Sequence, residues 1–554
     1  MSSNAINNKV GRRSFIKGAA FGLGALALGG PLLTACGNGA APSAGAGSSV
    51  VPLPAYLPQV IAKPDFKAPT AGVQNAWLRF PTDRAITVKG VVGSGKPVTA
   101  MTITYAQPPA PLEQNAYWQF MNKELNIDYK PIIAAANDFP AKFAATMAGG
   151  DIPDMVAIPV FMGLPRIPEM YKTVFQDLSE HLSGDAIKEY PNLANIDSET
   201  WKYCRVDGKI VGIPTARPTV GPPLMVRKDL FDQLGVSYNP KTADEFEAMC
   251  KAVTDPKANR YALSAMLGDF GTTWNTRVFG GIFGAPNNWK LESDGKLVRD
   301  IETTEFKDTV AFMKKLWDGG YWHPDSANQQ VATAKALFIS GNVLTYSNGI
   351  AAWATESANN PKIDIDVVYP FGAKGGKGAT YNNRPLFSLT AVKKSSDKEH
   401  TKEMLRILNY LCAPFGSQEN FNVSFGAEGK NYDVVDGVPK VNKTGQAEMG
   451  VSISRLGNGP QPLFSAIPID KDIKRQFDYQ VAADAVGMSD PTMPYWPITV
   501  TQMTSLEKAI TSGITDVVTG RQPLSSLDEV AKTWRTGGGD ELRKKYEDAI
   551  AADK

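Results

Sequence analysis

The sequence predicts a large α/β protein that folds as more than one lobe. The chain has 554 residues, of which 43% are hydrophobic and 9% aromatic, and this is enough for a core larger than one domain usually forms. Short β-rich runs alternate with helical patterns, which is typical of βαβ units on a mostly parallel sheet. The 58 Lys and Arg residues are dispersed among 56 Asp and Glu residues, so no concentrated positive field favours a nucleic-acid partner.

The alternation of strands and helices is clearest between residues 101 and 158. Strands are predicted at 101–105, 127–133 and 155–158, with helices at 114–124 and 138–147 between them. In a parallel sheet, ligands collect beyond the carboxyl ends of the strands. The loops that follow the three strands are therefore expected to share one rim, and they cover residues 107–113, 134–138 and 159–163.

The first 64 residues carry signals for export and anchoring rather than for folding. Residues 1–17 hold four basic and no acidic side chains, and a Gly-rich apolar run follows over 19–35. The segment around Arg12 and Arg13 resembles a twin-arginine export signal, and the run ends in a sequence that resembles the lipobox of bacterial lipoproteins. We therefore expect a signal peptide at 1–35, lipid attachment at Cys36 and a flexible tether over 36–64.

Composition argues against several kinds of enzyme. Only three His and four Cys residues are present, and the chain has no Gly-x-Ser-x-Gly elbow, no His-Glu-x-x-His helix and no Gly-x-x-x-x-Gly-Lys-Ser/Thr loop for phosphates. Cys204, Cys250 and Cys412 can form at most one disulfide among them, and buried free thiols are the simpler expectation. We therefore expect no cofactor and no catalytic centre of these kinds.

Several motifs, in order, resemble one known family. A Gly-Asp-Ile-Pro-Asp segment at 150–154 leads into the third predicted strand, and Thr242 with Glu245 forms a capping-box pattern at the start of a helix. Further matching segments lie at 207–214, 226–231, 341–349, 519–524 and 534–538. From about residue 98 onward the chain is similar to extracellular solute-binding proteins that serve sugar ABC importers, in particular to their large lipoprotein branch.

The resemblance implies a type II fold of the periplasmic binding proteins. Two lobes would be joined by several hinge crossings and would close around a solute in the cleft between them. The expected N-terminal lobe covers 98–220 and about 386–465, and the expected C-terminal lobe covers about 221–385 and 466–554. Such a protein would be a monomer anchored outside the cytoplasmic membrane that delivers a carbohydrate, preferably an oligosaccharide, to the permease.

A sugar site needs aromatic rings for stacking and polar groups for the hydroxyls. We expect the ligand-binding residues to lie on loops, and the candidates are Trp353, Trp274, Trp496, Tyr495, Arg217, Phe161, Asn137 and Gln107. Each has a structural alternative. The aromatic residues could close hydrophobic clusters, Arg217 could form a surface ion pair, and Asn137 or its neighbour Asp138 could cap the next helix.

No metal site is expected. Long members of the family often carry a calcium loop of alternating Asp and Asn around a Gly, and calcium needs some six to eight oxygen ligands. The corresponding stretch at 254–261 has Lys257, Ala258 and Arg260 where anionic ligands and the turn Gly should stand.

Two other functions stay open from the sequence. The 56 acidic residues offer many possible carboxylate pairs, so an extracytoplasmic polysaccharide-degrading enzyme is one alternative. The other is a binding protein for a peptide or another non-sugar solute, in which strand edges and charges would replace converging aromatic rings.

Overall fold

A computed structural model describes residues 50–105, 107–164, 166–264, 276–329, 331–464 and 470–553, without the side chains of residues 331, 332 and 358. These residues belong to the unit formed by 49–554. The predicted signal peptide, Cys36 and Trp274 lie outside the described residues.

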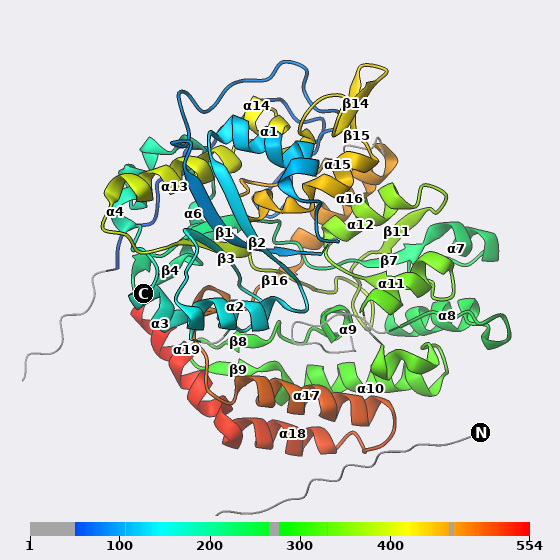
Figure 1. The fold of residues 1–554 in the computed structure, drawn as a ribbon. Helices are drawn as coiled ribbons and strands as arrows, with labels where there is room; N and C mark the ends of the chain where they lie inside the picture. Colours follow the sequence, from blue (N-terminus) through cyan, green and yellow to red (C-terminus); the bar gives the residue numbers. More distant parts are fainter. Residues whose placement is uncertain are drawn as a thin grey trace, which may run out of the picture. The chain divides into compact units, whose positions relative to one another are not determined.

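The first lobe, lobe 1, is built on a five-stranded sheet with the order β2-β1-β3-β13-β6 (Figure 1). Its strands are β1 (Pro97–Thr104), β2 (Asp128–Ala135), β3 (Met155–Pro159), β6 (Ile213–Ala216) and β13 (Leu386–Val392). β1 pairs in parallel with β2 and with β3, whereas β13 runs antiparallel to both β3 and β6. The three strands predicted between 101 and 158 are therefore confirmed, and they run in parallel.

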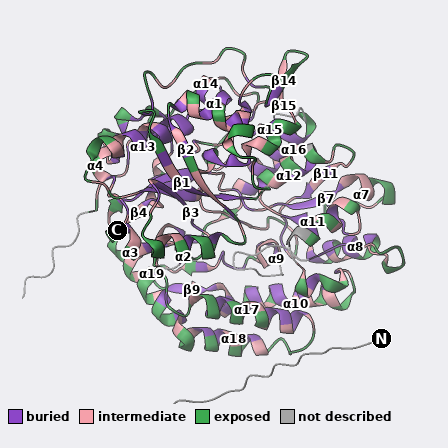
Figure 2. Cartoon of the chain, in the orientation of Figure 1, coloured by how far each residue is buried: buried purple, intermediate pink, exposed green. Residues whose placement is uncertain are grey.

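Lobe 1 holds the first of two large hydrophobic clusters. Every residue of β3 is buried, and the cluster gathers side chains from Val92 to Ile213 and from Leu386 to Leu456 (Figure 2). The helices of lobe 1 are α1 (Ala116–Leu125), α2 (Phe139–Gly149), α3 (Ile167–Thr173), α4 (Ser179–Leu182), α5 (Pro191–Ala194), α6 (Ser198–Lys202), α13 (Lys398–Leu411), α14 (Gln418–Phe425) and α15 (Lys443–Glu448). The predicted helices at 114–124 and 138–147 correspond to α1 and α2.

The second lobe, lobe 2, has a smaller sheet of different pairing. Its strand order is β10 (Thr345–Ser347), β7 (Leu224–Arg227) and β11 (Ile365–Val368), and both pairings are antiparallel. The prediction of a mostly parallel sheet is wrong for this lobe. Short β-rich runs reveal strands but not their relative directions, because direction depends on how the chain returns to the sheet.

Helices make up most of lobe 2. They are α7 (Lys228–Leu234), α8 (Ala243–Val253), α9 (Thr276–Phe283), α10 (Thr304–Asp318), α11 (Val331–Ser340), α12 (Ile350–Asn359), α16 (Asp470–Asp484), α17 (Met503–Val518), α18 (Ser526–Trp534) and α19 (Asp540–Ala552). Thr242 caps α8 as predicted, because its side chain accepts a hydrogen bond from the backbone N–H of Glu245 at 3.1 Å. The second large hydrophobic cluster combines residues from Leu224 to Phe371 with residues from Val500 to Ile550, so the C-terminal helices complete this core.

Four short hairpins or strand pairs complete the fold. They join β4 (Arg205–Val206) with β5 (Lys209–Ile210), β8 (Trp289–Leu291) with β9 (Leu297–Arg299), β14 (Tyr432–Val435) with β15 (Val438–Val441), and β12 (Thr380–Tyr381) with β16 (Gly487–Met488). The β12–β16 pair lies where the chain passes from lobe 2 back to lobe 1.

Three segments lie side by side at the crossing between the lobes. The backbone N–H of Arg217 donates to the carbonyl of Pro385 at 2.9 Å, and that of Asn383 donates to the carbonyl of Thr219 at 2.7 Å. The third segment joins them where the N–H of Ala216 donates to the carbonyl of Asn458 at 3.1 Å. We call these segments, residues 215–222, 380–386 and 456–460, the crossing segments.

The N-terminal segment, residues 50–95, contacts both parts of the body. The N–H of Ala55 donates to the carbonyl of Gly184 in lobe 1 at 3.0 Å. Farther along, Arg79 forms an ion pair with Asp470 at the start of α16. No helix within the described residues is both long and apolar enough to cross a bilayer.

Candidate ligand-binding site

One edge of the lobe 1 sheet collects the candidate residues of that lobe. β1, β2 and β3 run in parallel, so their carboxyl ends lie at the same edge. β13 is antiparallel to β3 and to β6, so this edge also receives the start of β13 and the end of β6. Tyr105, Asn137, Phe161, Arg217 and Phe387 therefore belong to one edge. The predicted rim therefore forms at this edge because of the directions of the strands in the sheet.

Four side chains at this edge form an aromatic and cationic cluster, which we call the rim cluster: Tyr105, Phe161, Phe387 and Arg455. The ring of Phe387 lies 5.2 Å from that of Phe161 and 6.3 Å from that of Tyr105, measured between centroids. The Cζ atom of Arg455 lies 4.9 Å from the Phe387 centroid and 5.8 Å from the Tyr105 centroid. Flat rings and a planar guanidinium are the groups with which proteins bind sugars and their substituents.

Charge is concentrated around the phenol of Tyr105. Burial raises the pKa of this phenol, and the charges of Arg455 and Arg217 oppose the rise. Arg455 is half-buried, and this burial lowers the pKa of its guanidinium. Tyr105 as a residue is nonetheless 60% exposed, so its ring is open to a solute.

The polar candidates of lobe 1 lie on the predicted rim loops. Asn137 is exposed in the turn between β2 and α2, and Gln107 is exposed after β1. The backbone carbonyl of Gln107 lies close to Gly450. A Cβ atom added to Gly450 would be 3.3 Å from the oxygen of this carbonyl. The neighbouring Asp138 occupies the N-cap position of α2 but makes no capping hydrogen bond, so the expectation that its side chain caps this helix is wrong.

Arg217 lies on a crossing segment. Its Nε donates to the carbonyl of Arg384 at 3.3 Å, and its backbone is held by Pro385. The side chain is half-buried. It therefore reaches the rim from the crossing, which places a cation where a solute could touch both lobes.

The prediction that Trp353 lies on a loop is wrong. Trp353 is on α12, is 0% exposed, and belongs to a third hydrophobic cluster together with Phe338 and Tyr346. The chain enters the helix directly after Gly349, so the expected loop ends before Trp353. Its ring offers no face to a solute in this structure.

Tyr495 and Trp496 are adjacent in sequence but pack on different cores. The indole Nε1 of Trp496 donates to the carbonyl of Tyr203 at 2.9 Å, and its ring meets Tyr171 edge to face against the lobe 1 cluster. The hydroxyl of Tyr495 donates to Asp553 at 2.9 Å, and its ring packs against the lobe 2 cluster. Burial and the nearby Asp553 carboxylate raise the pKa of Tyr495. This pair therefore joins the two lobes.

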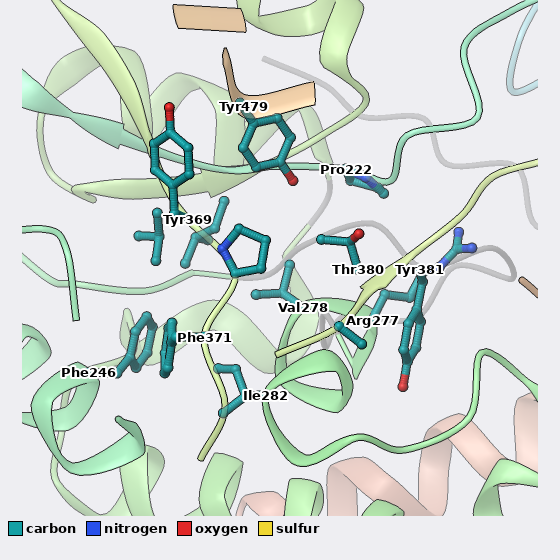
Figure 3. Close-up of a pocket in the computed structure, with 14 residues that line it drawn as sticks. Pro222, Phe246, Arg277, Val278, Ile282, Tyr369, Phe371, Thr380, Tyr381 and Tyr479 are labelled. Carbon is teal, nitrogen blue, oxygen red and sulfur yellow. The ribbon is translucent and has the colours of Figure 1, made fainter. Parts of the chain in front are cut away.

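Lobe 2 contains a pocket beside the crossing segments, which we call the lobe 2 pocket. The empty space inside it is about 520 Å³, and this volume includes the part that is open to solvent. Figure 3 shows Tyr369 and Tyr479 on one side of it and Arg277 and Tyr381 on another. The hydroxyl of Tyr381 donates to the carbonyl of Ala285 at 2.6 Å and is therefore engaged in the fold. The pocket is mostly apolar, with tyrosine rings in its wall.

Sequence reasoning missed Tyr105, Phe387, Arg455 and the lobe 2 pocket. Tyr105 had a usable signal, because it is the last residue of the first predicted strand and directly precedes a rim loop. Phe387 and Arg455 had none, because they return to the edge from more than 200 residues away in the chain.

The remaining candidate chemistry is structural. Cys204, Cys250 and Cys412 are buried free thiols, and burial raises the pKa of each. In the stretch compared with a calcium loop, Asp255 instead accepts hydrogen bonds from the backbone of its own turn, at Lys257 and Ala258. Within the described ranges, no three His, Cys, Asp or Glu side chains gather as a metal site would require.

Comparisons with known proteins agree with the fold and the family expected from the motifs. The profile of the family described as bacterial extracellular solute-binding protein matches residues 116–425, and this chain belongs to that family. The resemblance seen in the sequence is thereby confirmed. The family is one of binding proteins rather than enzymes.

Individual relatives are distant but cover most of the chain. The polygalacturonan/rhamnogalacturonan-binding protein YtcQ of Bacillus subtilis (strain 168) is 26% identical over 473 residues, which are 81% of this chain and 90% of that protein. Lipoprotein LipO of the same organism is 26% identical over 454 residues, which are 77% of this chain and 86% of that protein.

A solved structure confirms the two-lobed type II fold. The Streptococcus pneumoniae ABC-transporter substrate-binding protein FusA, in complex with kestose, aligns with a TM-score of 0.61 at 16% identity. The alignment covers 83% of this chain and all of that one. At this identity the likeness concerns the fold alone.

Proposed function

We propose that this protein is a lipid-anchored, extracytoplasmic receptor that captures an oligosaccharide and delivers it to the permease of an ABC transporter. It acts as a monomer, closes its two lobes around the solute, and releases the solute chemically unchanged and without a cofactor. Membership of the solute-binding family supports this proposal, as does the name of the relative that binds polygalacturonan and rhamnogalacturonan.

The observation that carries the proposal is the rim cluster beside the crossing segments. The exposed ring of Tyr105 can stack on the apolar face of a sugar, and Phe161 extends this surface. Arg217 and the exposed amides of Asn137 and Gln107 can form hydrogen bonds with hydroxyl groups. A solute bound here also lies next to lobe 2, so its contacts with that lobe would favour closure.

Lobe 2 contributes the second half of the proposed site. The lobe 2 pocket lies next to the crossing segments, and Pro222 and Tyr381 belong to both. Trp274, which lies outside the described residues, stays our candidate for stacking on a sugar. Trp353, Tyr495 and Trp496 instead serve the packing described above.

A screen by thermal unfolding tests the binding function. The purified protein is mixed with plant, algal and bacterial oligosaccharides, and a bound solute is expected to raise the melting temperature in proportion to the logarithm of its concentration. The same mixtures are then analysed by chromatography, and the sugars should be recovered at their original length. Failure of every saccharide to shift the transition, or the appearance of shorter sugars, would contradict the proposal.

Two variants within residues 1–36 test export and anchoring. Cys36→Ala is expected to release the protein from the membrane fraction and to abolish incorporation of a fatty-acid label. Replacement of Arg12 and Arg13 by Lys is expected to retain the protein inside the cell, since the twin-arginine pair would be lost. If Cys36→Ala stays membrane-bound and labelled, Cys36 is not the lipid attachment site.

A further inference from the structure

The guanidinium of Arg455 lies in an unusual electrostatic position. Several other half-buried or buried arginines face a carboxylate, as Arg227 does with Asp229 and Arg475 with Asp364. Arg455 instead lies against two aromatic rings, and the described part of the chain provides neither an ion pair nor a hydrogen bond for its guanidinium. The phenol of Tyr105 provides no counterion, because burial raises its pKa above the ordinary value of 10 and it stays neutral at neutral pH. A cation that is partly removed from water without a counterion is unfavourable unless a ligand supplies the counterion.

The backbone fixes this guanidinium at the rim. Arg455 ends a 3₁₀ turn, Ile453–Arg455, which begins after Ser452 in the left-handed conformation with φ of 59°. The hydroxyl of Thr215, in β6, donates to the carbonyl of Arg455 at 3.3 Å. Arg455 is thereby tied to the strand that ends at Ala216, directly before Arg217. The positive charges of Arg455 and Arg217 both oppose the rise in the pKa of the Tyr105 phenol, so both guanidinium groups lie near this side chain.

We propose that Arg455 and Arg217 form an anion subsite at the rim and that the solute is an acidic oligosaccharide containing a uronate unit. The carboxylate of the uronate would pair with the guanidinium of Arg455, and a sugar ring would stack on Tyr105. A guanidinium presents parallel N–H donors that match the two oxygens of a carboxylate. This inference rests on the proposed function and adds the charge of its substrate.

The aromatic rings under Arg455 strengthen the match. The Cζ atom of Arg455 lies 4.9 Å from the Phe387 centroid and 5.8 Å from the Tyr105 centroid, so both rings stabilise the cation, but neither neutralises its charge. An acidic sugar supplies both partners of this arrangement, because its ring has an apolar face and its carboxylate lies at the ring edge. A neutral sugar supplies only the first, and Arg455 would stay without a counterion.

Calorimetric titration of the purified full-length protein tests the subsite. The probes are short oligomers of galacturonic, glucuronic and mannuronic acid, each paired with its methyl ester, which has the same length but no charge. At least one acid is expected to bind about 10- to 100-fold more tightly than its ester, as charged hydrogen bonds predict. Its affinity should fall as salt is added, whereas that of the ester should not.

Two variants assign the effect to Arg455. Arg455→Met keeps the apolar length without charge and is expected to reduce the affinity for the acid about 10- to 100-fold while changing that for the ester less than about threefold. Arg455→Lys keeps the positive charge but loses the parallel N–H donors of the guanidinium, so it should retain part of the affinity for the acid. Arg521→Met is the matched control, since Arg521 is an exposed arginine paired with Asp516 in lobe 2. It should bind both probes as the wild type does.

The outcomes separate this inference from the proposed function. If esters or other neutral oligosaccharides bind as tightly as the acids, or if Arg455→Met leaves acid binding unchanged, the anion subsite is wrong and sugar capture stands. If the wild type binds no saccharide in this titration or in the thermal screen, the proposed function itself fails.

Discussion

The two halves of the proposed site differ in the kind of surface they offer. The rim cluster of lobe 1 is open and carries positive charge, with Tyr105 60% exposed and Arg455 beside it. The lobe 2 pocket is lined mainly by apolar and tyrosine side chains, and the hydroxyl of Tyr381 is already bonded to the backbone. In the proposed site, orientation and charge recognition would therefore belong mainly to lobe 1, and lobe 2 would provide a mostly apolar wall against which the solute is enclosed.

This division has a structural origin in the two sheets. In lobe 1, parallel strands bring their carboxyl ends to one edge, so residues from distant parts of the chain converge there. In lobe 2, the three-stranded sheet is antiparallel, so its loops are divided between both edges. Variants in both lobes test this contrast.

The largest effect is expected from Trp353, which separates packing in lobe 2 from ligand contact. Trp353→Ala should lower the free energy of unfolding by about 3–5 kcal/mol, because it removes a fully buried ring and leaves a cavity. Chemical denaturation measures this loss. Saccharide binding by the folded protein should persist. A variant with unchanged stability but no binding would instead identify Trp353 as a ligand contact.

A buried carboxyl in lobe 2 should make its stability depend on pH. Burial raises the pKa of Asp300 from 3.8 to about 6, while the charge of Arg299 opposes the rise. The folded state therefore holds the proton more tightly than the unfolded state. The stabilising contribution is complete below about pH 4 and is lost as the pH rises through about 6, by at most about 3 kcal/mol.

Asp300→Asn removes this titration. The variant should gain stability relative to the wild type between about pH 4 and pH 7, by up to about 3 kcal/mol, as measured by denaturation at a series of pH values. Below pH 4 the difference between the two proteins should stop changing, which provides the internal control. A constant difference over the whole range would show that Asp300 keeps its ordinary pKa.

The crossing segments should tolerate little added volume. An added Cβ at Gly221 would lie 2.2 Å from the carbonyl oxygen of Tyr381, so Gly221→Ala must push two crossing segments apart. We expect a loss of about 1–3 kcal/mol in stability and weaker solute binding, because both halves of the site adjoin these segments. Gly349→Ala is the control, since no atom lies within 4 Å of its added Cβ. Equal behaviour of the two variants would contradict the close approach.

The smallest effect on stability is expected at the rim. Tyr105→Ala should change the free energy of unfolding by less than about 0.5 kcal/mol, because the residue is exposed. It should nonetheless weaken saccharide binding by about 1 kcal/mol, or roughly fivefold, through the lost stacking. Tyr56→Ala, at an exposed tyrosine of the N-terminal segment, should do neither. If Tyr105→Ala binds normally, the rim cluster is not the stacking surface.

Much of lobe 1 and part of the site could be predicted from the sequence. The strands and helices between 101 and 158 follow from local patterns of apolar residues, and their parallel arrangement follows from the βαβ order. Phe161 and Asn137 could be placed on the rim because they follow predicted strands, and their contact with a solute stays a prediction. The position of Trp353 was missed, since a helix that starts directly after a Gly-containing turn cannot be distinguished locally from a longer loop.

Local patterns in the chain are sufficient to predict the family, the α/β class and the rim on which a solute is proposed to bind, because these depend on short-range periodicity and on the order of motifs. The packed structure was needed to distinguish the aromatic rings that are open from those that are buried. It also placed Phe387 and Arg455 next to Tyr105, although hundreds of residues separate them in the chain. The physical reason is that exposure and unpaired charge are properties of the packed chain, and packing joins residues without regard to their distance in sequence.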